Sequence, residues 1–294
     1  MGEQIPVILD TDIGSDIDDA VALAYLLRQP RCELVGITTV TGDVSKRCAL
    51  VDWICDAVQR RDIPIHAGAS RVLLHGPGQP DVPQYEALKN RQHRPDWLVG
   101  TAVDFLRQTI RSRPGEITLL TIGPLTNAAL LFALDPEIPS LLKQLVSMAG
   151  VYFKADGGRE WNCLVDPVAT GIVYATRLPR HICIGLDVTK QCRMPAGQVR
   201  ERFSPRPLDL VREMAEVWFK ERPNMTFHDP LAAAVIFQPD LCGYEDGVVT
   251  VELGPEEERS GRTTFVPGGS GSHHRVARTV RPEIFFAEFF SVFT

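Results

Sequence analysis

The chain has 294 residues, of which 44% are hydrophobic and 23% are charged, so it can bury a large core as a globular protein. Its formal net charge of -6 at pH 7 is spread along the sequence, which argues against nucleic acid or an anionic membrane as a partner. The seven cysteines are scattered without a C-x-x-C pair, which favours reduced, structural thiols. No apolar run approaches the ~18 residues that span a bilayer, and the N-terminus lacks a signal-peptide pattern, so a cytoplasmic location is expected.

Strand-like apolar runs alternate with helical patterns through the first half of the chain. In order, they predict a strand at 5–9, a helix at 19–28, a strand at 34–40, a helix at 45–60, a strand at 63–66, a helix at 96–111, a strand at 117–122 and a helix at 124–134. Such alternation is typical of βαβ units, in which helices cover a parallel sheet.

The second half continues this pattern, with no repeat and no low-complexity linker. Further elements are expected at 144–149, 167–176 and 181–186, with a helix at 230–237, a hairpin or pair of edge strands at 248–253 and 263–266, and a closing helix from 282. We therefore predict one α/β domain over residues 1–294, with a mostly parallel central sheet and helices on both faces, as in Rossmann-like folds.

Two connecting segments, 68–95 and 267–275, are longer than usual and rich in glycine. Long loops in compact domains are either functional or simple solvated connections, and both interpretations stay open here. The histidines in these loops are predicted to lie at the surface; they are His75, His93, His273 and His274.

The stretch ILDTDIGSDIDDAVAL, residues 8–23, crowds five aspartates into the turn between a predicted strand and a predicted helix. In open α/β sheets, ligands bind where strands end and helices begin. One aspartate can cap the helix, but like charges this close repel one another unless a cation shares them. Several oxygen ligands without clustered cysteine or histidine indicate a hard ion, Ca²⁺ or Mg²⁺.

Other aspartate-rich motifs fit this stretch less well. An EF-hand loop requires a closing bidentate glutamate, which is absent here. Phosphatases with an aspartyl nucleophile also begin with a strand and D-x-D, but their pattern has Thr or Val where this chain has Gly14. No Walker sequence occurs, so phosphoryl transfer remains a second hypothesis.

Two further predicted turns can contribute oxygen ligands. LLTIGPLTNAAL, residues 119–130, places a Gly-Pro pair at a strand-to-helix turn where a backbone carbonyl can face a ligand. TFHDPLAAAV, residues 226–235, places His228 and Asp229 directly before a proline, which suits the first turn of a helix. Each stretch alone is also compatible with ordinary turn and cap chemistry.

Together, these motifs closely resemble the inosine-uridine preferring nucleoside hydrolase family, enzymes that split the N-glycosidic bond of ribonucleosides. The family signature D-x-D-x-G followed by D-D-A is matched by Asp10, Asp12, Gly14, Asp18, Asp19 and Ala20. Further matches are ITTVTGD (37–43), IPIHAGA (63–69), GPLTNAAL (123–130), LVSMAG (145–150), EWNCLVDPVA (160–169), LDVT (186–189) and HDPLAA (228–233). The resemblance covers nearly the whole chain and implies the nucleoside hydrolase fold.

The resemblance implies a Ca²⁺ ion at the bottom of the pocket, where it also holds the ribose 2′ and 3′ hydroxyls and the attacking water. Carried over, its ligands are Asp12, Asp19, the backbone carbonyl of Thr126, and Asp229. Asp12 is then the general base, since a cation lowers the pKa of its bound water and an adjacent carboxylate can take the proton. Asp10 is interpreted as a partner that orients Asp12 or the helix start.

The same resemblance assigns residues to the substrate. Asp18, Glu160 and Asn162 match family positions that hold the ribose hydroxyls. Contacts that tighten as the sugar flattens and gains positive charge assist cleavage through an oxocarbenium-like state. His228 matches a histidine beside the departing base, where it is expected to protonate the leaving group.

The chain departs from the family pattern at positions that bear on the substrate. The family usually has G-N where this chain has Gly42 and Asp43, so a substrate-contacting amide becomes a carboxylate at Asp43. Trp161 replaces the usual Phe. Asp16 and Ile17 form a two-residue insertion, so Asp16 is an alternative to one of the assigned aspartates.

We therefore expect a Ca²⁺-dependent nucleoside hydrolase that releases free base and ribose in purine or pyrimidine salvage. A hydrolase of another N-riboside and a non-catalytic ribonucleoside binder are the alternatives. A binder has no need of a carboxylate placed to deprotonate water, so Asp12 favours an enzyme. The resemblance further implies a homodimer or homotetramer, and the preferred nucleobase stays open.

Overall fold

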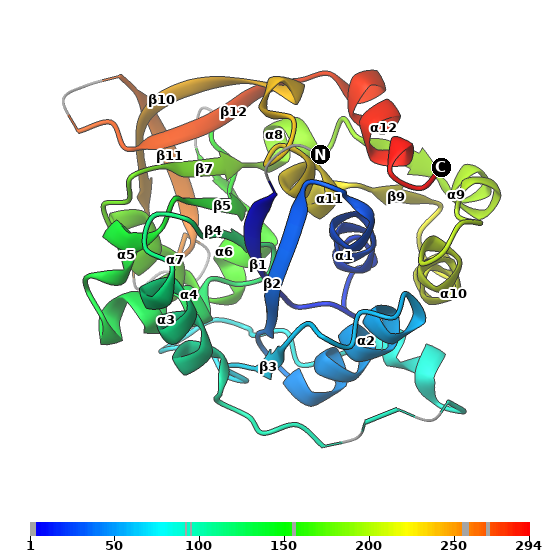
Figure 1. Ribbon diagram of the computed structural model, residues 1–294. Helices are drawn as coiled ribbons and strands as arrows, with labels where there is room; N and C mark the ends of the chain where they lie inside the picture. The colour runs from blue at the N-terminus through cyan, green and yellow to red at the C-terminus, as the bar shows by residue number, and fades with distance from the viewer. Residues whose placement is uncertain (1–3, 92, 95, 155–156, 255–258, 269–270) are drawn as a thin grey trace.

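The computed structural model describes residues 4–91, 93–94, 96–154, 157–254, 259–268 and 271–294. Within these residues, ten strands form one sheet (Figure 1). From edge to edge they are β3 (Ile65–Ala67), β2 (Cys32–Thr39), β1 (Ile5–Thr11), β4 (Thr118–Thr121), β5 (Gln144–Met148), β7 (His181–Ile184), β12 (His274–Val280), β10 (Cys242–Val251), β11 (Arg262–Pro267) and β6 (Gly158–Arg159). Neighbours from β3 to β12 run parallel, whereas β10, β11 and β6 pair antiparallel. The predicted mostly parallel central sheet is confirmed.

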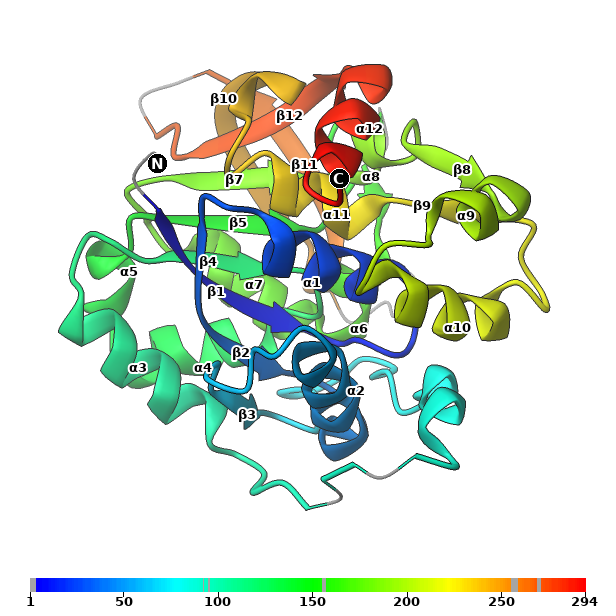
Figure 2. The same ribbon diagram turned by 45° about the vertical axis from the view of Figure 1, so that its right-hand side comes forward.

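Helices cover both faces of this sheet, as predicted (Figures 1 and 2). One layer holds α1 (Asp18–Arg28), α2 (Val44–Ala57), α10 (Leu208–Trp218), α11 (His228–Ala234) and α12 (Pro282–Ser291), and the other holds α3 (Ala102–Ser112), α4 (Thr126–Leu134), α5 (Ile138–Leu141) and α7 (Pro167–Ala175). Successive side chains of a strand point to opposite faces. In β1, Val7 and Leu9 therefore enter one core and Ile8 enters the other.

Shorter elements connect these layers. They are α6 (Trp161–Val165), α8 (Leu186–Thr189), α9 (Ala196–Arg202), the 3-10 helices η1 (Pro83–Leu88) and η2 (Pro239–Leu241), and an antiparallel pair of β8 (Arg193–Pro195) and β9 (Asn224–Thr226). η1 lies within the long 68–95 segment, so part of that predicted loop is helical. Over the described ranges, no helix combines the length and the apolar character needed to cross a membrane.

The sequence patterns do not predict β12, which lies between β7 and β10 in the sheet. The prediction of a surface loop is wrong at His274, which begins β12 and is 1% exposed. Arginines interrupt the apolar residues of this strand at Arg275 and Arg278, and they hide its pattern. The amphipathic helix α10 likewise has no predicted counterpart.

The buried His274 packs against a second buried histidine. β12 pairs with β7 so that His274 lies beside His181, with ring centroids 5.2 Å apart. Tyr174 of α7 stacks on His274, with ring centroids 5.4 Å apart. Burial lowers the pKa of His274 to about 4 and lowers the pKa of His181 well below its usual range. Both rings are therefore neutral in the folded protein at neutral pH.

We expect these histidines to make the protein sensitive to acid. In the unfolded chain each ring binds a proton near pH 6.5, whereas folded His274 does so only near pH 4. The contribution of neutral His274 to the free energy of unfolding is therefore fully present above pH 6.5 and is lost as the pH falls toward 4. For His274 this loss is roughly 3 kcal/mol. Thermal unfolding at about pH 7.5 and about pH 5 measures this loss. Between these two pH values, the Tm of the His274→Gln variant should fall less than that of the wild type. An equal fall in Tm would contradict the assignment of the acid sensitivity to His274.

Candidate active site

A cavity of about 370 Å³ opens where the central strands end and the following helices begin. Asp12 follows β1, Ile122 follows β4 and Met148 ends β5. Ligands of open α/β sheets bind at this edge of the sheet. The residues singled out from the sequence that line the cavity are Asp12, Asp16, Asp18, Asp19, Glu160, Trp161, Asn162, His228 and Asp229.

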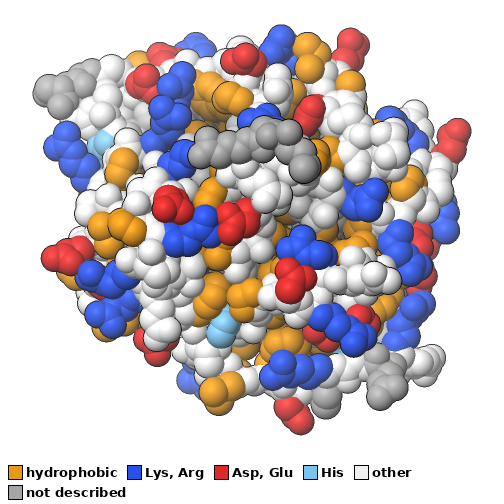
Figure 3. Space-filling view, viewed as in Figure 1, with side chains coloured by type: hydrophobic (Ala, Val, Ile, Leu, Met, Phe, Trp, Pro, Cys, Tyr) orange, Lys and Arg blue, Asp and Glu red, His pale blue; other side chains and the backbone are white. Residues whose placement is uncertain are grey.

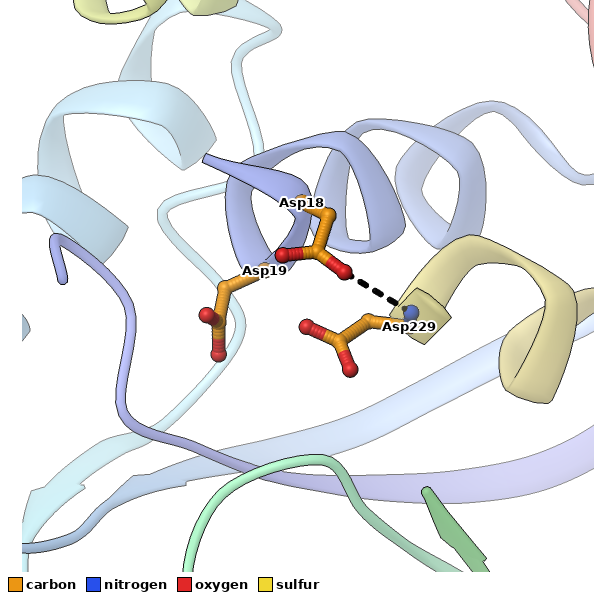
Figure 4. A group of neighbouring side chains, drawn as sticks. All are labelled: Asp18, Asp19 and Asp229. Carbon is orange, nitrogen blue, oxygen red and sulfur yellow. Dashed lines mark hydrogen bonds between the residues drawn. The ribbon is translucent and has the colours of Figure 1, made fainter. Parts of the chain in front are cut away.

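Three of these aspartates form an acidic cluster (Figure 4). Asp18 and Asp19 begin α1, Asp229 lies in the first turn of α11, and one carboxylate oxygen of each lies within 4.8 Å of the others. The Asp229 N–H donates to Asp18 Oδ2 at 3.1 Å, which joins the two helix starts. Acidic residues are favourable at these positions because the first turn of a helix carries a partial positive charge.

Electrostatics make the acidic cluster a candidate metal site. All three side chains are buried, and burial raises the pKa of each well above its usual range. The neighbouring carboxylates raise these pKa values further, because each negative charge disfavours the next. A cation shared by the oxygens offsets both effects, so the acidic cluster could hold a metal ion.

Asp12 lies beside the acidic cluster and is also buried. The chain approaches it closely at Gly123, where a Cβ would lie 2.8 Å from Asp12 Oδ1. Burial raises the pKa of Asp12, while the charge of Arg47 lowers it. A carboxylate that lines a cavity and has a raised pKa is suited to accept a proton from water.

The cation beside the aspartates, Arg47 of α2, was missed by the sequence prediction. Its guanidinium is fully buried and donates to Ser15 Oγ and to the backbone carbonyls of Asp12, Ile13, Thr41 and Gln79. Arg47 lies on the buried face of α2, three residues after Val44 and four before Val51. An arginine on an apolar helix face was the available sequence signal for this buried counter-charge.

Asp10 is not among the described residues that line the cavity. Its Oδ1 accepts hydrogen bonds from Thr38 Oγ1 at 2.5 Å and from Asn127 Nδ2 at 2.7 Å. Burial raises the pKa of Asp10 to about 7. These bonds join β1 to β2 and α4.

Thr126, whose backbone carbonyl was predicted as a metal ligand, is not among the described residues that line the cavity. Thr126 begins α4, where its carbonyl is directed along the helix, and its hydroxyl donates to Asp166 Oδ2 at 2.8 Å. Among the described residues of this turn, Ile122 lines the cavity. The predicted turn thus reaches the cavity through Ile122, the residue directly after β4.

Glu160 and Asn162 reach the cavity from the start of α6. The Glu160 carboxylate caps this helix, accepting from the N–H of Asn162 at 2.9 Å and of Cys163 at 3.1 Å. Asn162 Nδ2 donates to the carbonyls of Ile122 at 2.8 Å and Met148 at 3.0 Å. Because both amide hydrogens are used, Asn162 offers only its oxygen to a ligand.

His228 lines the cavity as the first residue of α11. Burial lowers its pKa to about 4, and the charges of Lys190 and Arg193 act in the same direction. The His228 Nδ1 lies 2.7 Å from Thr189 Oγ1. When Nδ1 accepts the hydroxyl proton, the neutral ring carries its own proton on Nε2 and can donate a hydrogen bond from there to a ligand.

Asp43 is not among the described residues that line the cavity. Its carboxylate caps α2, accepting from the Lys46 N–H at 3.1 Å and pairing with Lys46 Nζ at 2.9 Å. An aspartate directly before a helix commonly makes this bond to the third residue of the helix. The placement argues against the predicted substrate contact at Asp43.

Other cavity residues come from segments without a recognised motif. Gln79 belongs to the long 68–95 segment, and Trp218 and Arg222 come from the end of α10 and the turn after it. Arg222 lies over the Trp218 ring at 5.6 Å from its centroid. These side chains add an amide, an aromatic surface and a cation to an otherwise acidic cavity.

The fold and the cavity define an α/β enzyme. Its cavity combines a candidate metal site with space for a small polar substrate. The chain belongs to the inosine-uridine preferring nucleoside hydrolase family, whose model matches residues 7–287. It is therefore a nucleoside hydrolase, an enzyme that cleaves ribonucleosides.

Relatives and solved structures agree with this assignment. A pyrimidine-specific ribonucleoside hydrolase RihA of Shewanella oneidensis is 32% identical over 273 residues, covering 85% of this chain and 83% of its own. Uridine nucleosidase 1 of Arabidopsis thaliana is 28% identical over 276 residues, covering 86% and 80%. A solved plant nucleoside hydrolase has a TM-score of 0.85 at 22% identity over 99% of both chains. A purine-preferring ribonucleoside hydrolase from Gardnerella vaginalis has a TM-score of 0.81 at 22% identity over 98% of both.

Proposed function

We propose that this protein is a Ca²⁺-dependent N-ribohydrolase that splits ribonucleosides into free base and ribose. The observation that carries the proposal is the acidic cluster of Asp18, Asp19 and Asp229 beside Asp12 in one cavity. The donors fit calcium because they are carboxylate and carbonyl oxygens, which hard cations prefer.

Asp12, Asp19 and Asp229 are the proposed metal ligands. The carbonyl of Ile122 replaces that of Thr126 in this set, because Ile122 lines the cavity. When bound, Ca²⁺ would neutralise the buried carboxylates and lower the pKa of a nearby water.

Asp12 is the proposed general base. Its carboxylate takes a proton from the water that attacks C1′ and holds that proton on an Oδ atom. Burial favours this protonated product state, since it raises the pKa of Asp12. Arg47 binds the Asp12 carbonyl and so fixes the main chain from which the base projects.

Asp18, Glu160 and Asn162 are proposed to hold the ribose hydroxyls. Their oxygens accept hydrogen bonds from hydroxyl groups, and the negative charge of Asp18 and Glu160 favours a sugar that becomes cationic. His228 is proposed to protonate the departing base from Nε2 in its imidazolium form, with Nδ1–H donated to Thr189 Oγ1, and to return to the neutral ring that its lowered pKa favours.

Release of free ribose from a panel of purine, pyrimidine and nicotinamide ribosides tests the proposal. Uridine and cytidine are the first substrates to try, because the two relatives above are named for uridine and for pyrimidine ribonucleosides. Ribose release from nicotinamide riboside alone would favour the alternative of another N-riboside, and release from none would contradict catalysis. Light scattering of the same sample tests the expected homodimer or homotetramer.

Removal of the metal should abolish turnover. The oxygen set predicts about one Ca²⁺ per chain, and without it the buried carboxylates repel one another. Treatment with a chelator should therefore stop ribose release, and added Ca²⁺ should restore it. Elemental analysis that finds zinc, or full activity of a metal-free sample, would contradict a calcium site.

A further inference from the structure

The turn at residues 41–43 has an aspartate where an amide side chain was expected. The same turn packs against Gln79, whose side chain does carry an amide. Thr41 and Gly42 adopt φ angles of 60° and 65°, in the left-handed region. This conformation directs Asp43 toward the start of α2, where its carboxylate caps the helix. The other side of the same turn packs against Gln79.

Three contacts fix the main chain at Gln79. Its N–H donates to Thr41 Oγ1 at 3.1 Å, and its carbonyl accepts from Arg47 Nη2 at 2.8 Å. Gly42 allows this approach, because a Cβ there would lie 2.2 Å from the Gln79 carbonyl oxygen. Both polar main-chain groups of Gln79 are thus engaged with this turn and α2, and what remains to face the cavity is the side chain.

A carboxamide adds a hydrogen-bond donor beside carboxylates that cannot donate. The carboxylates of Asp12 and Asp18 accept hydrogen bonds when ionised but cannot donate them. The nearby Asn162 amide uses its two hydrogens on backbone carbonyls. A ribose hydroxyl that donates its proton to a carboxylate still has an oxygen that can accept one. The Gln79 carboxamide can supply that donor.

We propose that Gln79 is a specificity-determining residue whose carboxamide binds a ribose hydroxyl of the substrate, taking the place of the amide absent at Asp43. Thr41 and Arg47 are its positioning residues. The Arg47 guanidinium also binds the Asp12 carbonyl, so one side chain fixes both the substrate amide and the proposed base. The inference rests on the proposed ribonucleoside substrate.

Kinetics with deoxygenated substrates test this contact. Gln79→Ala should lower kcat/KM on the best ribonucleoside by roughly 10-fold, the effect of about one lost hydrogen bond. On the 2′-, 3′- or 5′-deoxy form that lacks the contacted hydroxyl, the loss should shrink to less than roughly 2-fold, because wild type has already lost the bond. Equal losses on the ribonucleoside and all three deoxy forms, or no loss on any, would overturn the proposal.

Two further variants distinguish loss of the Gln79 contact with the ribose from a general disturbance of the site. Asp43→Asn should leave the order of substrate preference unchanged, because residue 43 caps α2 and an asparagine can do the same. Thr41→Val removes the hydroxyl that fixes Gln79, and its loss should also shrink on that deoxy substrate. A substrate shift in Asp43→Asn, or a Thr41→Val loss that is equal on all substrates, would contradict the assigned geometry.

Binding of a C-riboside, whose carbon–carbon bond cannot be hydrolysed, distinguishes this inference from the proposed reaction. Calorimetry should show weaker binding to Gln79→Ala than to wild type by a similar factor, whether or not turnover occurs. Binding without ribose release from any riboside would refute the hydrolase but leave the contact standing. Equal binding by both proteins would refute the contact alone.

Discussion

Replacing Asp12 by asparagine should lower kcat by roughly 10²-fold or more, because the amide keeps a ligand oxygen but cannot accept the proton of the attacking water. Steady-state kinetics on a ribonucleoside measures the loss, and elemental analysis of the same sample shows whether metal is retained. The matched control is Asp10→Asn. Asp10 binds Thr38 and Asn127 and is not among the described residues that line the cavity, so its substitution should have a milder effect.

Near-normal turnover of Asp12→Asn with metal bound would assign the base to another carboxylate. Asp16 is the alternative, because it lines the same cavity. Burial raises the pKa of Asp16 to about 7, a value suited to proton exchange near neutral pH. In that case Asp16→Asn would show the larger loss of the two variants.

Replacing His228 by alanine should lower turnover of the natural nucleoside by roughly 10² to 10⁴-fold. A purine or pyrimidine anion is a poor leaving group unless it receives a proton, and the variant removes the Nε2 donor. On p-nitrophenyl riboside the loss should be far smaller, because p-nitrophenolate leaves readily without protonation. The ratio of the two losses is the measurement that isolates leaving-group activation.

Equal losses on both substrates would mean that His228 positions the ribose or the acidic cluster instead. Thr189→Val is a companion variant, since it removes the hydroxyl that lies 2.7 Å from Nδ1 but leaves the ring in place. If that hydroxyl stabilises the protonated ring, its loss should reduce turnover of the nucleoside more than turnover of the p-nitrophenyl riboside.

The sequence predicted the central sheet because its buried strands have strong local signals. β1, β2 and β4 are short, continuous apolar runs between turns, and the helices that follow them carry acidic or small residues at their starts. β12 escaped prediction because its place between β7 and β10 is decided by pairing partners distant in the chain, not by its own arginine-rich pattern.

Site residues that belong to a recognisable sequence motif could be predicted. Contacts that depend on the exact position of the backbone could not. Five of the aspartates, together with Glu160 and His228, line the cavity; they are Asp12, Asp16, Asp18, Asp19 and Asp229. The choice between Ile122 and Thr126 depends on where β4 stops and α4 starts, to within a few residues, which sequence patterns do not resolve. Arg47 and Gln79 escaped notice because their roles arise only when α2 and the 68–95 segment pack together.

The hydrogen bond between the Asp229 N–H and Asp18 joins residues 211 positions apart, so the acidic cluster exists only after α11 has docked on α1. An ion that binds this cluster binds the folded chain and not the unfolded one, and therefore stabilises the whole fold against unfolding. At a free concentration ~100 times its Kd, such a ligand adds about 2.7 kcal/mol to the free energy of unfolding. Loss of an ion bound there would remove this contribution and leave the folded chain more open to unfolding and proteolysis.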